Sequence, residues 1–107
     1  MNLPSPIQVY FDAYNRNDDE ALILTFAPDA IVEDEGHSYA GRDVIEAWSR
    51  ETRAKYQPTV EPLEIDEESN FFKIRAKVTG QFTGSPVTLT YAFRLDGDKI
   101  TRLEIGA

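Results

Sequence analysis

The sequence contains no cysteine and a single histidine, His37. A disulfide framework, a thiolate zinc site and a cysteine nucleophile are therefore excluded, and one histidine cannot build a multi-histidine metal centre. The chain also lacks a nucleophile elbow, a P-loop, a dinucleotide-binding fingerprint and a metal-binding helix motif. We therefore expect a protein that works without a metal and without a cofactor.

Basic residues are also scarce, with 11 Lys and Arg against 19 Asp and Glu, which gives a net charge of −8. Such a chain repels nucleic acid and anionic lipid, so neither nucleic acid nor a membrane is expected as a partner. The first residues do not form the basic and apolar regions of a secretory signal, and we expect a cytoplasmic location.

Aromatic residues, in contrast, are more numerous than a minimal core requires. The chain has six Phe, five Tyr and one Trp among 107 residues. Its length suits one domain, and 41% hydrophobic with 28% charged residues is typical of a globular protein. We expect a single domain over residues 1–107, in which part of the aromatic set lines a pocket.

The N-terminal segment has helical periodicity. Ile7, Tyr10, Phe11 and Tyr14 recur at i, i+3, i+4 and i+7, which predicts an amphipathic helix. Ser5 is its expected N-cap. The apolar face of this helix therefore carries two phenol groups.

Two further helices are predicted before residue 57. Asp18 is the expected cap of a short helix that includes Phe26 and stops before Pro28. A longer helix is predicted over residues 41–56, with Trp48 on its inner face.

The second half of the chain alternates between apolar and polar residues. Residues 72–82 and 87–95 each place apolar side chains on one face, which predicts two strands of a half-covered sheet. Asp96-Gly97 is a strong hairpin signal that leads into a third strand at 100–105. The chain is therefore predicted to end in an antiparallel meander.

Other segments have weaker strand signals. Residues 30–34 form a short β-prone run, followed by a polar loop at 35–38. A strand at 59–65 contains Pro62, which predicts an edge position or a bulge. The acidic residues 66–68 are expected in a solvated loop. Helices followed by a meander indicate an α+β fold, with helices on one face of a curved sheet and a pocket between them.

Asp34 is the first candidate for a catalytic residue. It shares a strand face with Val32, and an inward carboxyl would have a raised pKa and could act as a general base. The alternative is a solvated acidic turn, because Glu33 and Glu35 flank it.

Other residues have the same two interpretations. Tyr10, Tyr14 and Tyr91 occupy inward positions, where a phenol hydroxyl can donate to a developing oxyanion or belong to an ordinary core aromatic. His37 could act as an acid or base or gate the pocket, or it could be solvated. Trp48 fits the core or the pocket wall.

Several segments resemble the NTF2-like superfamily, and its SnoaL-like branch in particular. The resemblance spans residues 4–106, and its most similar stretches are residues 10–15, 17–18, 26–30, 32–34, 39–45 and 93–97. It implies a cone of three N-terminal helices packed on a curved, mainly antiparallel sheet, with an apolar pocket at one end and frequent dimers through the outer sheet face. Activity is left open, because the superfamily includes isomerases, polyketide cyclases, dehydratases, epoxide hydrolases and non-catalytic modules.

The resemblance to ketosteroid isomerases assigns roles to three residues. It matches Tyr10 to the oxyanion-donating tyrosine and Asp34 to the general base. The second oxyanion donor, an aspartate in those enzymes, falls on Tyr91. The similar polyketide cyclases also use an acidic side chain in the pocket as the general base. The Asp-Arg-Asp arrangement of the family's epoxide hydrolases has no clear match in this sequence.

The leading hypothesis is a small-molecule pocket protein that abstracts a proton next to a carbonyl, as an isomerase or a cyclase. Its ligand would be an apolar or carbonyl-containing small molecule, and the protein a homodimer. The alternatives are a non-catalytic ligand-binding or dimerisation module and, less favoured, a protein-docking domain. The catalytic residues would be Asp34, Tyr10 and Tyr91, and the substrate-binding residues Tyr14, Phe26, Val32, His37, Trp48, Phe82 and Phe93.

Overall fold

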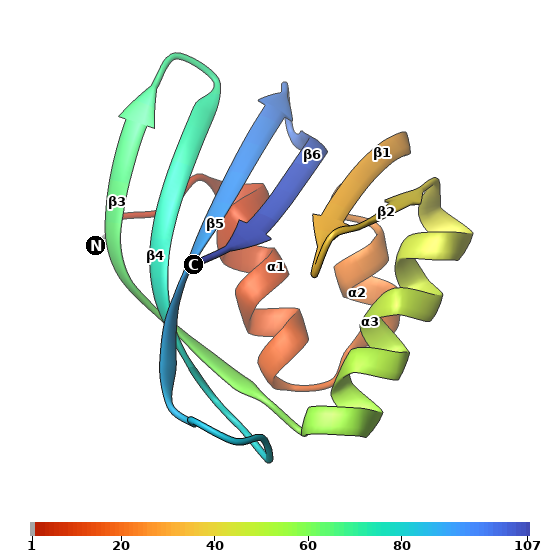
Figure 1. Ribbon diagram of the computed structural model, residues 1–107. Coiled ribbons are helices and arrows are strands. Elements are labelled where there is room, and N and C mark those ends of the chain that lie inside the picture. The colour runs from red at the N-terminus through yellow and green to blue at the C-terminus, as the bar shows by residue number, and fades with distance from the viewer. Residues whose placement is uncertain (1) are drawn as a thin grey trace.

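Six strands form one curved sheet, and three helices pack on one of its faces (Figure 1). The computed structural model describes residues 2–107. The helices are α1 (Ser5–Asn15), α2 (Asp19–Ile23) and α3 (Arg42–Tyr56). The strands are β1 (Phe26–Asp34), β2 (His37–Ala40), β3 (Thr59–Glu68), β4 (Phe71–Thr79), β5 (Val87–Asp96) and β6 (Lys99–Gly106). The predicted α+β class, with helices on a mainly antiparallel sheet, is confirmed.

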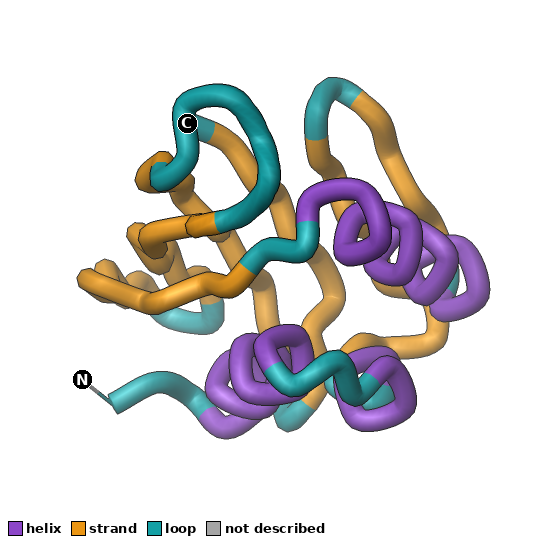
Figure 2. Tube along the Cα trace, turned by 90° about the horizontal axis from the view of Figure 1, so that it is seen from below, coloured by secondary structure: helices purple, strands orange, loops and turns teal. Residues whose placement is uncertain are grey.

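The strand order is β2-β1-β6-β5-β4-β3. Strands β3 to β6 form the predicted antiparallel meander, and β1 joins it by pairing in parallel with β6. This pairing sets Asp34 opposite Ile105 and Val32 opposite Leu103. A view at right angles to the first shows the helices along one side of the strands (Figure 2). The last residues of the sheet therefore lie beside the candidate base.

Helix α1 buries the predicted apolar stripe, but its cap differs from the prediction. Pro4 occupies the N-cap position and no side chain caps the helix, so the assignment of Ser5 as the cap was wrong. Pro6 lies in the first turn, where its missing N–H has no partner to lose. For α2 the prediction is confirmed, because the Asp18 carboxylate accepts a hydrogen bond from the Ala21 N–H at 3.0 Å.

Helix α2 is shorter than predicted, because the chain is already in a strand at Phe26. The Phe26 carbonyl accepts hydrogen bonds from the Arg42 guanidinium at 2.7 and 3.0 Å, and Phe26 pairs with Ile100 of β6. Its ring is fully buried. Pairing and burial in the sheet outweigh the local helical pattern, so the predicted helix through Phe26 was wrong.

The loop predicted at residues 35–38 is a tight hairpin. Only Glu35 and Gly36 turn, both with positive φ of 52° and 77°, as the two central residues of a type I′ turn require. His37 pairs with Asp34, and Ser38 pairs with Glu33. Both His37 and Ser38 therefore belong to β2, and the predicted loop was wrong at these two positions.

Strand β3 also extends beyond its prediction. It continues through the acidic residues 66–68, which lie opposite β4 rather than in a loop, and Asp66 faces Lys73 across the pair. Pro62 occupies an edge strand beside a register shift, as predicted. Cross-strand pairs of opposite charge favour the longer strand.

The core lies between α1 and the sheet and is rich in aromatic rings. Tyr10 meets Phe26 and Phe93 edge to face, with ring centroids 5.9 and 5.5 Å apart. Phe11 contacts Phe93 in the same way, at 5.8 Å. Edge-to-face packing places ring edges against ring faces, which stabilises such clusters. In the described part of the chain, no helix has the length and apolar character needed to cross a membrane.

Candidate functional site

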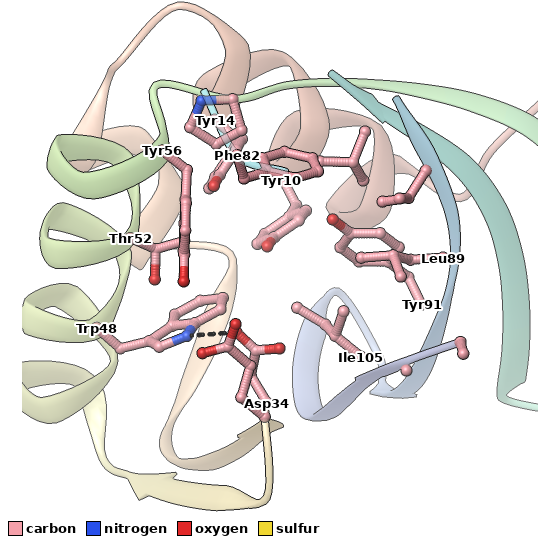
Figure 3. A pocket seen from close by; sticks show the side chains of 16 residues that line it. Tyr10, Tyr14, Asp34, Trp48, Thr52, Tyr56, Phe82, Leu89, Tyr91 and Ile105 are labelled. Atoms are coloured by element: carbon pink, nitrogen blue, oxygen red, sulfur yellow. Dashed lines mark hydrogen bonds between the residues drawn. The ribbon is translucent and has the colours of Figure 1, made fainter. Parts of the chain in front are cut away.

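A cavity of about 410 Å³ opens between α1, α3 and the sheet (Figure 3). Its size is within the range of small-molecule sites. Tyr10 and Tyr14 come from α1, Trp48, Thr52 and Tyr56 from α3, and Leu89, Tyr91 and Ile105 from β5 and β6. The walls are mostly aromatic and aliphatic, so the few polar groups among them stand out.

Asp34 is the most prominent of these polar groups. It ends β1, its side chain is half-buried at the cavity wall, and its Oδ2 accepts a hydrogen bond from the Trp48 indole Nε1 at 3.1 Å (Figure 3). Burial raises the pKa of Asp34, the charge of Glu35 raises it further, and the hydrogen bond from Trp48 opposes both effects. A carboxyl in such surroundings accepts protons more readily than a solvated one.

Two tyrosine hydroxyls face the same cavity as the Asp34 carboxylate. Tyr10 from α1 and Tyr91 from β5 are almost fully buried, and Figure 3 shows their hydroxyls directed into the cavity. Burial raises the pKa of both phenols, and the nearby Asp34 charge adds to the effect. Both therefore stay protonated near neutral pH and remain hydrogen-bond donors.

Tyr14 completes the tyrosine group and adjoins a buried cation. Its ring stacks on Tyr10 at 6.1 Å, and the Arg53 guanidinium lies 5.6 Å from the Tyr14 ring centroid. Burial raises the pKa of Tyr14, whereas the Arg53 charge lowers it. Arg53 is itself buried and forms an ion pair with Asp19 of α2.

Six of the ten residues that the sequence suggested for the site line this cavity. Phe26, Val32 and Phe93 do not, because they are fully buried in the core beside it. His37 is exposed on β2 and lines a separate, more polar hollow. The six lining residues are Tyr10, Tyr14, Asp34, Trp48, Phe82 and Tyr91.

Sequence reasoning did not single out the other polar residues on the α3 wall, Thr52 and Tyr56. Both follow Trp48 at helical spacing, i+4 and i+8, so extending its inward face by two turns would have found them. Within residues 2–107, no cluster of three or more His, Cys, Asp and Glu side chains could hold a metal ion.

The curved sheet, the three helices on one face and the cavity between them define the NTF2-like fold class. A family model for the SnoaL-like domain matches residues 7–103 of this chain. The chain therefore belongs to the SnoaL-like domain family.

Solved structures agree with this assignment. A protein from Sinorhizobium meliloti, named as a candidate polyketide cyclase, is 47% identical with a TM-score of 0.94, over 96% of this chain and 94% of that one. A Catenulispora acidiphila protein with a ketosteroid isomerase-like fold, solved with trimethylamine, is 22% identical with a TM-score of 0.87, over 99% and 87%. An NTF2-like protein from Cytophaga hutchinsonii is 13% identical with a TM-score of 0.79, over 94% and 84%. A comparison with curated protein sequences finds no match.

Proposed function

We propose that the cavity binds a carbonyl-containing apolar small molecule and that Asp34 removes a proton from the carbon next to the carbonyl. The observation that carries this proposal is the half-buried Asp34 carboxylate on the same cavity as the hydroxyls of Tyr10 and Tyr91. A base and two neutral hydrogen-bond donors around an apolar space are the groups that enolisation requires.

The proposed step uses only groups of this chain and the ligand. The Asp34 carboxylate takes the proton, the electron pair of the broken C–H bond moves towards the carbonyl, and an enolate forms. The hydroxyls of Tyr10 and Tyr91 donate to its oxygen, where negative charge develops. If the enolate is conjugated with a neighbouring C=C bond, return of the proton from Asp34 to the far carbon gives an isomer. If the enolate carbon attacks a second carbonyl, a ring closes, and the resulting alkoxide takes the proton back from Asp34.

The name of the Sinorhizobium meliloti relative supports ring closure as the outcome, because that protein is 47% identical and named as a candidate polyketide cyclase. The ketosteroid isomerase-like fold of the more distant neighbour supports the same proton abstraction only through the shared fold. Both reactions begin with the same enolate, so one assay can test the common step.

The test is hydrogen–deuterium exchange at the carbon next to the carbonyl of one- to three-ring ketones, followed by NMR in D2O. We expect the protein to accelerate exchange and Asp34→Asn to lower the acceleration by about 100-fold or more, because the amide is not a base. The Asn side chain keeps an oxygen that can accept from Trp48, so the melting temperature should stay near that of the wild type. Asp29→Asn, at an exposed position of the same strand, is the matched control.

Two results would argue against the proposal. Exchange that survives Asp34→Asn would remove Asp34 from the reaction. Tight binding of ketones without any accelerated exchange would instead favour a non-catalytic ligand-binding module, in which the same cavity serves binding alone.

A further inference from the structure

One line of side chains along α3 faces the cavity. Trp48, Thr52 and Tyr56 succeed one another at four-residue intervals, which brings them onto one face of the helix, about 6 Å apart along its axis. The Trp48 indole N–H donates a hydrogen bond to the Asp34 carboxylate. The two following residues take no part in the proposed proton transfer, although both direct hydroxyl groups at the same space (Figure 3).

Within residues 2–107, the hydroxyl of Thr52 makes no hydrogen bond. A threonine inside a helix commonly donates to the carbonyl four residues earlier, and threonine is a poorer helix former than alanine. In the described chain, the α3 side chains with hydrogen bonds or ion pairs include those of Arg42, Glu46, Trp48, Arg50 and Arg53, whereas Thr52 has none. A half-buried hydroxyl at a cavity wall can gain a hydrogen bond when a ligand enters.

Tyr56 lies one turn further on and is held in place by its neighbours. Its ring meets Phe82 edge to face at 5.9 Å, and the Lys55 ammonium lies 5.0 Å from its centroid. A ring fixed on two sides presents its hydroxyl with little loss of side-chain entropy on binding. The α3 wall therefore offers two hydroxyls, in line with the Trp48 indole.

The remaining walls are different in character. Val87, Leu89 and Ile105 form an aliphatic surface from β5 and β6. The ionisable side chains of the lining other than tyrosine are Asp34 and Glu35, and within residues 2–107 no Lys, Arg or His lines the cavity. At the Asp34 end, an anionic group of the ligand would meet like charge in an apolar setting, which is costly.

We infer that Thr52 and Tyr56 form a second polar subsite, and that the ligand is a ketone carrying a hydroxyl or second carbonyl on the edge facing α3. This inference rests on the proposed function. The reacting carbonyl lies at the Asp34 end, the apolar part of the ligand lies on β5 and β6, and the second oxygen group binds one or two helical turns away.

Matched ligands test the subsite. The probes are β-tetralone and its analogues with a hydroxyl on the far ring, with dissociation constants measured by NMR titration. We expect at least one hydroxylated isomer to bind the wild type about tenfold tighter than β-tetralone.

The variants Thr52→Val and Tyr56→Phe remove one hydroxyl each and keep the side-chain shape. Each should reduce the preference for the hydroxylated isomer several-fold and leave the affinity for β-tetralone unchanged. Thr88→Val is the control, because Thr88 is exposed on β5 between the lining residues Val87 and Leu89.

The outcomes separate this inference from the function on which it rests. Hydroxylated isomers that bind no tighter than β-tetralone, or variants that weaken all ligands equally, would overturn the subsite while exchange assays still support Asp34. Failure of every ketone to bind the wild type would overturn both.

Discussion

Trp48 both orients Asp34 and limits its basicity. The indole N–H donates to one carboxylate oxygen at 3.1 Å, and this hydrogen bond lowers the pKa of Asp34 against the larger effect of burial, which raises it. The other carboxylate oxygen receives no hydrogen bond from Trp48. A general base works best when its pKa lies near the working pH, so these opposing effects bear directly on the proposed reaction.

Replacing Trp48 by Phe should therefore shift the pH dependence of exchange. Without the indole donor the pKa of Asp34 rises further. Because the base acts only as the carboxylate, the rate falls as pH drops through that pKa. We expect the acidic limb of the profile to move to higher pH. Exchange rates measured between pH 4 and 9 test this, and an unchanged limb in a folded variant would show that the hydrogen bond does not act on the base.

Individual site residues were predictable where periodicity and resemblance agreed. The helical stripe and strand alternation placed Tyr10, Asp34 and Tyr91 on inward faces, and all three line the cavity. The same patterns could not separate Phe93, predicted on a strand, or Phe26, predicted on a short helix, from these three residues. An inward side chain under a helix belongs to the core, whereas one beyond the helix faces open space, and only the three-dimensional packing distinguishes the two.

At the scale of elements, the short helix α2 depends on a buried charge on α3. Arg53 is only 9% exposed, forms an ion pair with Asp19 and lies over the ring of Tyr14. An unpaired guanidinium in this position would have lost its hydration without a counter-charge. The pair therefore connects α1, α2 and α3 behind the cavity.

Asp19→Asn should destabilise the fold more than a matched change at an exposed pair. We expect a loss on the order of 2 kcal/mol, below the usual value for a fully buried pair because the Asp19 side chain is 26% exposed. Glu46→Gln, which breaks the exposed pair with Arg50 at 2.9 Å, should cost less than about 0.5 kcal/mol. Urea unfolding of both variants gives the comparison, and equal losses would mean that the Arg53 pair contributes no more than a surface one.

Long, strongly periodic elements were predicted well, and short ones were not. Helix α3 and strands β4 and β5 have many residues in phase, so their type and approximate extent follow from sequence, but β4 ends at Thr79, and the prediction that it continues to Phe82 was wrong. The junction at Phe26 was misread because apolar residues near the end of a short helix fit its pattern equally well. What decides it is pairing with Ile100, which lies far along the chain.

At the scale of the whole molecule, the outer face of the sheet is the proposed dimer surface. Lys73 and Arg75 on β4 are exposed beside Glu64 and Asp66 on β3. Adjacent rows of opposite charge can complement themselves across a two-fold axis. The family resemblance implies the same surface.

We therefore expect light scattering to give twice the monomer mass, and Lys73→Glu to lower that mass by placing like charges along the interface. High salt should weaken the dimer to some degree, because exposed charges are screened. A single-chain mass that does not change with protein concentration would contradict the dimer.

The parallel pairing of β1 with β6 has a consequence for the order of folding. On the ribosome, the β1–β2 hairpin emerges early, but the strand that joins it to the rest of the sheet is the last one to be synthesised. Contacts so distant along the chain form late and slow the search for the native state. Since Asp34 on β1 meets Ile105 on β6 at that seam, a nascent chain acquires its proposed reactive site only in the step that completes the fold.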